Sequence, residues 1–388
     1  MSQTDAASAS ATGVMDYDPS TIGYSVMNEA PRVTDRHRDG QVYTSELVYE
    51  VEKQKVFYND WLNVGRIEEV AKPGDYITHR IADEPIIVAR TRENKLVAMA
   101  NVCAHRGVEV AFGEGNTKLF TCPYHGWVYD LDGKLKDAQY LEDTDFNPRT
   151  CQLPQLKVDT WGGFIFVTLN PNPKPLLEAL GDVPKVYAPY QLERLRMAFK
   201  SPFQLNVNWK LVNENLTDVY HIAVLHANTF GPHQPLSEYR FAITDGGYHG
   251  RFAGGTLTPT GQSLFGGPMP WLPESLHSGG YSSHIPPNMA FFPRFDYVSY
   301  STTWPISVDS CLITSYMLFP EEYFEQPDFW EKAEVYLEFY KAFLAEDLDM
   351  IHSLQKGLKS RYYGRGPMSR FEAGVRATIK HNIDDVSA

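Results

Sequence analysis

Four side chains in two short runs of the sequence could hold a metal cluster. Cys103 and His105 occur in the first run and Cys122 and His125 in the second, so each run supplies one thiolate and one imidazole. A Rieske [2Fe–2S] centre uses such a set, with two Cys on one iron and two His on the other. A structural zinc site is the alternative, but zinc motifs usually keep like ligands together. The mixed runs therefore favour the cluster.

A second pair of candidate ligands, His221 and His226, lies near the middle of the chain. On a regular helix, side chains five positions apart point about 140° away from each other. If both histidines bind one ion, the helix predicted over 211–226 must end or bulge between them. Glu214, Asp218 and His221 fall at i, i+4 and i+7, which predicts one shared helix face. The alternative is two ordinary histidines near a helix end, with Asp218 a solvated charge.

Both sets of residues lie within longer motifs that resemble those of one enzyme family. The stretch from Cys122 to Asp130, CPYHGWVYD, is very similar to the Rieske loop of ring-hydroxylating oxygenase large (alpha) subunits. The pattern N-W-K-x₃-E-N-x₂-D-x-Y-H-x₄-H over 208–226 is similar to the iron-binding segment of the same oxygenases. The likeness extends from about residue 45 to about residue 380 and so covers most of the chain.

The resemblance implies two cofactors, a Rieske [2Fe–2S] cluster and a mononuclear non-haem Fe(II). In this family two Cys and two His hold the cluster, two His bind the iron, and an Asp links the iron to the cluster of the neighbouring subunit. The matching positions in this sequence are, for the cluster, Cys103, His105, Cys122 and His125; for the iron, His221 and His226; and for the link, Asp218.

A carboxylate would complete a facial triad and leave open positions for oxygen. Asp347 and Asp349 both lie in an amphipathic segment predicted as a helix over 328–358. Asp347 falls on its apolar face and Asp349 on its polar face. A carboxylate on a buried face is costly unless it is paired or binds a metal, so Asp347 is the predicted third ligand. The family's usual acidic segment matches Glu346-Asp347, followed by Gln355, and points to the same residue.

These residues must be positioned by an α+β protein, for which we predict two domains after an N-terminal arm. Residues 1–40 read as a flexible arm, 41–170 as an all-β Rieske domain of short strands, and 171–388 as a catalytic domain. The proline-rich stretch from Asn170 to Pro175 marks the boundary. In the catalytic domain, an antiparallel sheet flanked by helices is expected, with strands predicted over 240–260, 288–304 and 311–319.

The substrate pocket is predicted within 220–320, where aromatic residues are dense, although most of these aromatics could equally be sheet core. The candidate pocket residues are Asn215, Phe230, Phe292, Arg294, Tyr300 and Trp304. An apolar slot suits an aromatic substrate, with Arg251 or Arg294 as a carboxylate anchor, whereas an aromatic cage suits a quaternary ammonium compound. The family's general habit favours the aromatic substrate. The long segment 254–273 could form a lid over the pocket.

The function that follows is that of a terminal oxygenase component. It uses O₂ and electrons from a separate NAD(P)H-dependent reductase, directly or through a ferredoxin, to mono- or dioxygenate a small, aromatic substrate. A nicotinamide or flavin fingerprint between a strand and a helix is not apparent in the sequence. The family analogy also implies a homotrimer, with or without a small β subunit.

Three other functions are compatible with parts of the sequence. One is an oxidative demethylase or monooxygenase acting on a quaternary ammonium, methoxy or N-methyl compound. Another is a Rieske electron-transfer protein without oxygenase activity, which would need only the first 170 residues. The last is a zinc-stabilised binding protein.

Composition excludes some partners and favours one compartment. The net charge of −13 argues against nucleic acid, whose binding surfaces are basic. The sequence has neither an apolar run long enough for a membrane span nor a visible signal peptide. A disulfide between the remaining cysteines, Cys151 and Cys311, is not expected, because a reducing cytoplasm suits a thiolate-held cluster. We therefore expect a cytoplasmic enzyme with no membrane partner.

Overall fold

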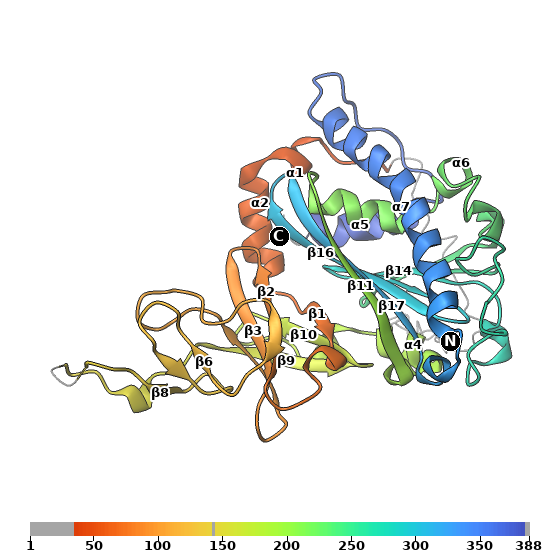
Figure 1. The fold of residues 1–388 in the computed structure, drawn as a ribbon. Helices are drawn as coiled ribbons and strands as arrows, with labels where there is room; N and C mark the ends of the chain where they lie inside the picture. The colour runs from red at the N-terminus through yellow and green to blue at the C-terminus, as the bar shows by residue number, and fades with distance from the viewer. Residues whose placement is uncertain (1–34, 142–143, 385–388) are drawn as a thin grey trace, which may run out of the picture.

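The computed structural model describes residues 35–141 and 144–384 and contains three antiparallel sheets with helices packed against them (Figure 1). The predicted N-terminal arm falls almost entirely outside the described residues. Within these residues, no helix combines the length and the apolar character needed to cross a bilayer. The α+β class is as predicted.

The first half of the chain forms a seven-stranded sheet and a smaller three-stranded one. The large sheet has the order β1-β10-β9-β4-β3-β2-β5 and the small one β6-β7-β8. Their strands are β1 (Leu62–Arg66), β2 (Asp75–Ile81), β3 (Glu84–Arg90), β4 (Leu96–Ala100), β5 (Glu114–Asn116), β6 (Phe120–Thr121), β7 (Val128–Tyr129), β8 (Leu135–Asp137), β9 (Gln155–Trp161) and β10 (Phe164–Thr168). The small sheet projects away from the rest of the molecule (Figure 1).

The segment that precedes β1 is helical, although the sequence analysis placed it in the all-β domain. It forms α1 (Gln41–Thr44), α2 (Glu46–Glu52) and a π-helical turn (Lys53–Phe57). The Tyr43 hydroxyl donates a hydrogen bond to the Glu214 carboxylate at 2.8 Å, and the Trp209 indole donates to Glu52 at 3.0 Å. These helices therefore pack against the second domain. Their many Tyr and Val residues, which favour strands, obscured the helical spacing of the buried positions.

The second half is built around a seven-stranded sheet of order β11-β17-β16-β15-β14-β13-β12. Its strands are β11 (Leu195–Leu205), β12 (Arg240–Thr244), β13 (Gly247–Phe252), β14 (Gly280–Ile285), β15 (Met289–Pro293), β16 (Val298–Ser307) and β17 (Ser310–Pro320). The helices are α3 (Leu176–Ala179), α4 (Val183–Tyr187), α5 (Trp209–Thr217), α6 (Ile222–Leu225), α7 (Phe329–Leu358) and α8 (Ala373–Ile379). The long helix is present, and strands lie in the predicted ranges 288–304 and 311–319. In the predicted range 240–260 the strands end at Phe252, so its last eight residues are not a strand.

The two faces of this sheet have different partners, because successive side chains of a strand point to opposite sides. On one face, Tyr300 packs on Phe164 of the first domain, with ring centroids 5.0 Å apart. On the other face, Ser315 lies 2.6 Å from the Tyr340 hydroxyl of α7. A site that includes residues of α7 therefore lies on the face of the sheet opposite Phe164.

Candidate active site and cluster site

The helix that carries the central motif breaks where the histidine spacing requires it. Helix α5 is capped at its start by Asn208, whose side chain accepts a hydrogen bond from the Lys210 backbone N–H at 3.0 Å. It ends at Thr217, the backbone of the next residue, Asp218, is extended (φ −75°, ψ 118°), and α6 begins only after His221. The break turns the two imidazoles toward each other, with ring centroids 5.0 Å apart for His221 and His226.

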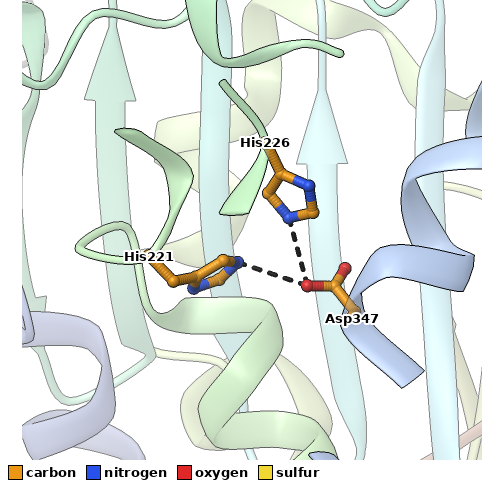
Figure 2. A group of neighbouring side chains, drawn as sticks. All are labelled: His221, His226 and Asp347. Carbon is orange, nitrogen blue, oxygen red and sulfur yellow. Dashed lines mark hydrogen bonds and ion pairs between the residues drawn. The ribbon is translucent and has the colours of Figure 1, made fainter. Parts of the chain in front are cut away.

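Asp347 of α7 completes the set. One potential ligand atom from each of His221, His226 and Asp347 lies within 4.8 Å of the others. Asp347 Oδ1 is 3.4 Å from His221 Nε2 and 3.1 Å from His226 Nε2 (Figure 2). Asp347 is only 4% exposed, whereas Asp349 is exposed. The arrangement fits the 2-His-1-carboxylate geometry of a non-haem iron site.

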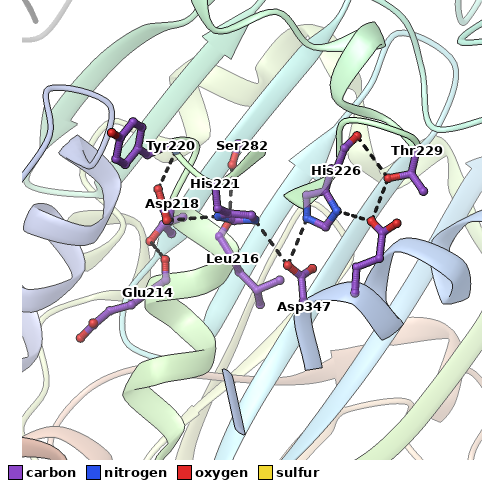
Figure 3. Close-up of polar contacts among 11 residues, drawn as sticks. Glu214, Leu216, Asp218, Tyr220, His221, His226, Thr229, Ser282 and Asp347 are labelled. Carbon is purple, nitrogen blue, oxygen red and sulfur yellow. Dashed lines mark hydrogen bonds and ion pairs between the residues drawn. The ribbon is translucent and has the colours of Figure 1, made fainter. Parts of the chain in front are cut away.

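A carboxylate lies beside the outer nitrogen of each imidazole (Figure 3). His221 Nδ1 is 3.1 Å from Asp218 Oδ2, and His226 Nδ1 is 2.7 Å from Glu346 Oε2. The Thr229 hydroxyl donates to the same Glu346 oxygen at 2.9 Å. Protons on the two Nδ1 atoms would face these carboxylates, which leaves both Nε2 lone pairs directed at a common ion.

Glu346 is a functional candidate that the sequence analysis missed. It entered only as a neighbour of Asp347 in the acidic segment. Its partner, His226, is 120 residues away in the chain, so no local spacing links the two. The sequence did offer one signal: adjacent residues of a helix point in different directions. If Asp347 binds the metal, Glu346 could therefore contact a histidine ligand instead.

The electrostatics of the site favour a cation between the three side chains. Burial alone would lower the pKa of His221, but the carboxylates of Asp218 and Asp347 outweigh it and raise the pKa to about 9. Burial would raise the pKa of Asp347, but the two histidines reverse this and hold it below its usual range. A bound metal would replace the protons that this cluster otherwise retains.

Glu214 does not share a face with Asp218 and His221, contrary to the i, i+4, i+7 prediction. The helix ends at Thr217, so Asp218 and His221 leave the helical path. The Glu214 side chain points away from His221 (Figure 3) and is bonded to Tyr43. Its burial raises the pKa of Glu214 to about 7.

Four of the six predicted pocket residues lie on the active-site side of the sheet or on α5. Phe230 packs against His226 with ring centroids 4.4 Å apart, and Asn215 lines a small cavity with Leu344 and Leu348, which flank Asp347 on α7. Phe292 pairs with Ser299 and so lies on the same face of the sheet as Ser301, opposite Tyr300. Arg294 is buried over the ring of Phe252.

Tyr300 and Trp304, by contrast, do not lie in the predicted pocket. Tyr300 stacks on Tyr316 with centroids 4.3 Å apart and an interplanar angle of 2°. Trp304 packs against His79 of the first domain, at a centroid distance of 5.7 Å. Side chains at every second position of a strand point to the same face. Tyr300 and Trp304 are four positions apart on β16, so both point to the face opposite α7. Aromatic content alone could not tell the two faces apart.

The segment 254–273 has neither helix nor strand, as predicted. It is nevertheless packed into the protein: the Thr256 hydroxyl donates to Asp296 at 2.7 Å. Phe265 stacks on Tyr323 and Tyr336, with centroids 4.7 Å and 5.8 Å away. Its role as a lid stays a prediction.

The four residues of the first motif meet at the end of the first domain. Cys103 and Cys122 are each only 2% exposed, whereas His105 and His125 are exposed. The two His Nδ1 atoms are 3.1 Å apart, so both can reach one ion at about 2.0–2.1 Å. Buried thiols with outward imidazoles match the asymmetry of a Rieske centre.

Two similar turns and an aromatic shell hold these ligands. The Gly107 N–H donates to the Cys103 carbonyl and the Gly126 N–H to the Cys122 carbonyl. Both glycines have positive φ, 82° and 71°, a conformation that favours glycine. The indole of Trp127 stacks on His105 at 5.0 Å. Such a shell limits water at the cluster and so tunes its potential.

The cluster site and the iron site lie on opposite sides of the folded molecule. Cys122 and His125 lie in the loop between β6 and β7. Figure 1 shows β6 and β8 on the side of the molecule farthest from α6, which lies between His221 and His226.

Comparison with known proteins identifies both halves of the chain. The Rieske [2Fe-2S] domain matches residues 60–155, and the ring hydroxylating alpha subunit (catalytic domain) matches residues 177–386. The carnitine monooxygenase oxygenase subunit of Escherichia coli (strain K12) is 29% identical over 343 residues, which cover 86% of this chain and 87% of that protein.

Other relatives match over shorter segments, and solved structures share the fold. The glycine betaine monooxygenase oxygenase subunit of Pseudomonas aeruginosa (strain UCBPP-PA14) is 34% identical over 180 residues, 46% of this chain and 42% of that protein. The structure of a quaternary ammonium Rieske monooxygenase has a TM-score of 0.78 at 24% identity, covering 92% of this chain and 96% of that chain. Naphthalene 1,2-dioxygenase from Rhodococcus sp. has a TM-score of 0.74 at 20% identity, covering 89% and 93%.

The catalytic-domain match spans more than half of the chain, and its residues include the His221, His226 and Asp347 group. Proteins of this kind carry a Rieske cluster and a mononuclear iron, form oligomers and receive electrons from a separate reductase. The chain therefore belongs to the ring-hydroxylating alpha subunits and is the terminal oxygenase of a Rieske non-haem iron oxygenase.

Proposed function

We propose that this oxygenase oxidises a small quaternary ammonium compound. The relatives named for carnitine and glycine betaine support this substrate class, and the former matches over 86% of the chain. The benzene 1,2-dioxygenase alpha subunit of Pseudomonas putida (strain ATCC 700007) is 32% identical over 47% of the chain, a coverage like that of the glycine betaine relative, so the carnitine relative, with 86%, carries the comparison. The preference for an aromatic hydrocarbon, drawn from the family's habit, is therefore not supported.

The convergence of His221, His226 and Asp347 on one point supports the oxygenase chemistry, whereas the carnitine relative supports the substrate class. We assign the mononuclear iron to these three residues and the cluster to Cys103, His105, Cys122 and His125, in a Rieske domain over 41–170 joined to a catalytic domain over 171–388. Iron held by these three residues would supply the oxygen activation.

The chemistry balances as a monooxygenation. One atom of O₂ enters a C–H bond next to the ammonium nitrogen, and the other leaves as water with two electrons and two protons. The resulting hydroxylated carbon loses the amine and becomes a carbonyl. The protein's task is to hold that carbon beside the open site while Asp218 and Glu346 keep the two imidazoles in place.

Asp218 is also the proposed bridge to a neighbouring subunit. Its side chain is 21% exposed while one of its oxygens lies beside His221, so it can also accept a hydrogen bond from outside the chain. With the two sites far apart in one chain, the simplest assembly is a homotrimer in which each cluster meets the next subunit's iron. A ferredoxin and a small β subunit would be additional components, and a reducing cytoplasm suits the thiolates.

A single-turnover experiment tests this function without the natural reductase. Chemically reduced, iron-loaded enzyme is mixed with ¹⁸O₂ and L-carnitine, glycine betaine or naphthalene, and the products are analysed by mass spectrometry. Because an aldehyde exchanges its oxygen with water, the carbonyl is reduced to the alcohol with borohydride immediately after turnover. We expect an ¹⁸O-labelled alcohol from the trapped carbonyl fragment and a released amine from a quaternary ammonium compound, and no product from Asp347→Ala. Labelled naphthalene diol with no turnover of either ammonium compound would contradict the proposal.

A further inference from the structure

The guanidinium of Arg294 is buried without a carboxylate partner. The residue is 3% exposed. Among residues 35–141 and 144–384, no Asp or Glu oxygen lies within 4.0 Å of its nitrogens, and its Nε has no hydrogen-bond acceptor. Burial lowers the pKa of Arg294, but a guanidinium stays protonated in proteins. The buried carboxylate of Asp296 attracts the guanidinium from a distance but makes no ion pair with it. A buried cation without a direct partner is costly, so an anion in contact with the fork would stabilise it.

Neutral groups hold this guanidinium in a fixed orientation. With Gln234 Nε2 donating to the Tyr239 hydroxyl at 2.7 Å, Gln234 Oε1 accepts from both terminal nitrogens of Arg294 at 2.9 Å. The guanidinium carbon lies 4.6 Å from the centre of the Phe252 ring. One amide oxygen and one ring face satisfy part of the donor fork, and none of them carries a charge. The other Arg considered, Arg251, donates instead to three backbone carbonyls.

Arg294 belongs to the active-site side of the sheet. Tyr239 and Phe252 are members of the same hydrophobic cluster as Phe230 and Phe343. Phe230 contacts the ring of His226 at 4.4 Å and packs on Phe343 at 4.8 Å. The same hydrophobic cluster therefore contacts both a candidate iron ligand, through Phe230, and the Arg294 guanidinium, through Phe252.

We propose that Arg294 binds the carboxylate of the substrate, so that the enzyme selects zwitterionic quaternary ammonium carboxylates over quaternary ammonium alcohols. This inference rests on the proposed function. A carboxylate would neutralise the buried cation through charge-assisted, bidentate hydrogen bonds. The ammonium group would then lie against the aromatic rings. A ligand with a positive charge and no carboxylate would instead face uncompensated repulsion from Arg294.

Binding to the metal-loaded enzyme tests the proposal. Titration calorimetry uses L-carnitine, glycine betaine and the carboxylate-free analogue choline as probes. For the wild type we expect at least one of the two carboxylates to bind about 30-fold or more tightly than choline, and Arg294→Gln to lose about that factor. Arg294→Lys should recover part of it. Arg196→Gln is the matched control, since Arg196 is exposed and paired with Glu321 at the surface.

Melting curves separate a binding role from a structural one. Because no carboxylate in the described part of the chain lies within 4.0 Å of the Arg294 nitrogens, Arg294→Gln should melt at or above the wild-type temperature without ligand. The carboxylate probe should raise the melting temperature of the wild type only. Unchanged carboxylate binding by a folded Arg294→Gln would overturn the proposal, and so would a lowered melting temperature with equal losses for all probes.

The same data distinguish this inference from the proposed function. If the wild type binds and turns over choline as well as the carboxylates, the function stands and the role of Arg294 fails. If it binds benzoate in an Arg294-dependent way but none of the ammonium compounds, the proposed substrate fails while the carboxylate site stands.

Discussion

At the scale of single residues, the iron site depends on which nitrogen of each imidazole is free. Each Nδ1 lies beside a carboxylate, Asp218 or Glu346, and each Nε2 faces Asp347. The sequence was sufficient to name the two histidines, Asp218 and Asp347. Glu346 was not predictable, because its role comes from a contact between segments far apart in the chain.

Removing the Glu346 carboxylate should weaken metal binding. In Glu346→Ala, His226 loses the partner that fixes its tautomer, and iron affinity should fall about 10- to 100-fold. Titration of metal-free enzyme with Fe(II), or with Co(II) as an optical probe, measures this. Glu338→Ala is the control on the same helix, because Glu338 is exposed and forms a surface ion pair with Lys341. Wild-type affinity in Glu346→Ala would show that Thr229 or packing alone orients His226.

Asp218→Ala should separate metal binding from turnover. The Asp218 carboxylate lies beside His221 Nδ1 as Glu346 lies beside His226 Nδ1, so Fe(II) affinity should fall by a similar factor and the variant is measured after loading with excess Fe(II). In the loaded protein both metals should be present, while steady-state turnover should fall about 100-fold because the proposed bridge is missing. Iron analysis and O₂ consumption measure the two effects. Normal turnover in this variant would remove Asp218 from the path between the sites.

At the scale of elements, the histidine spacing correctly required a broken helix. The direction in which Glu214 points once the helix is broken was not predictable. The face assignment assumed helical geometry through position 221, whereas α5 ends at Thr217. The strand β16 was predicted, but which of its faces carries the active site depends on packing against the first domain. The hydrophobic periodicity of a sequence locates a helix or strand along the chain. Which other element each of its faces packs against is decided by tertiary contacts.

Glu214 should make the stability of this region depend on pH. Its pKa is raised to about 7 by burial, above the value for an unfolded Glu, so the unfolded chain loses its proton first. The stability linked to Glu214 is therefore fully present below about pH 4.5 and is lost as pH rises through 7, by about 3 kcal/mol in all.

Glu214→Gln should remove this dependence, because an amide mimics the protonated acid. Relative to the wild type, the variant should unfold at higher denaturant concentration at pH 8 and at a similar one at pH 5. The exposed Glu334 provides a control in Glu334→Gln, which should leave the midpoints unchanged at both pH values. An equal effect of Glu214→Gln at pH 5 and pH 8 would mean that Glu214 is ionised throughout this range.

At the scale of the whole molecule, the cluster site and the iron site lie at opposite ends (Figure 1). Electron transfer within one chain would be long, whereas a ring of subunits can bring one chain's exposed His105 and His125 to the next chain's Asp218. Such a ring uses two different surfaces of each subunit. Neither surface could be read from the sequence, because the separation of the sites is a property of the folded chain.

Mixed subunits test transfer between chains. Cys122→Ser should lack the cluster and Asp347→Ala should lack the iron, so each protein alone should be inactive. Co-expression should restore roughly a quarter of the functional interfaces in a randomly mixed ring, measured as product formed per iron. Placing Asp218→Ala on the iron-binding partner should abolish the recovery. No recovery in any mixture would indicate transfer within a chain.

The central claim is that one chain holds two separate iron centres, and metal analysis tests it most directly. Iron and acid-labile sulfide are counted on anaerobically purified wild type, Asp347→Ala and Cys122→Ser, together with the EPR spectrum after reduction. We expect about three irons and two sulfides per wild-type chain with a Rieske-type signal, loss of one iron alone in Asp347→Ala, and loss of the sulfide and signal in Cys122→Ser. Zinc without sulfide in the wild type, or an Asp347→Ala protein that keeps all its iron, would contradict the account.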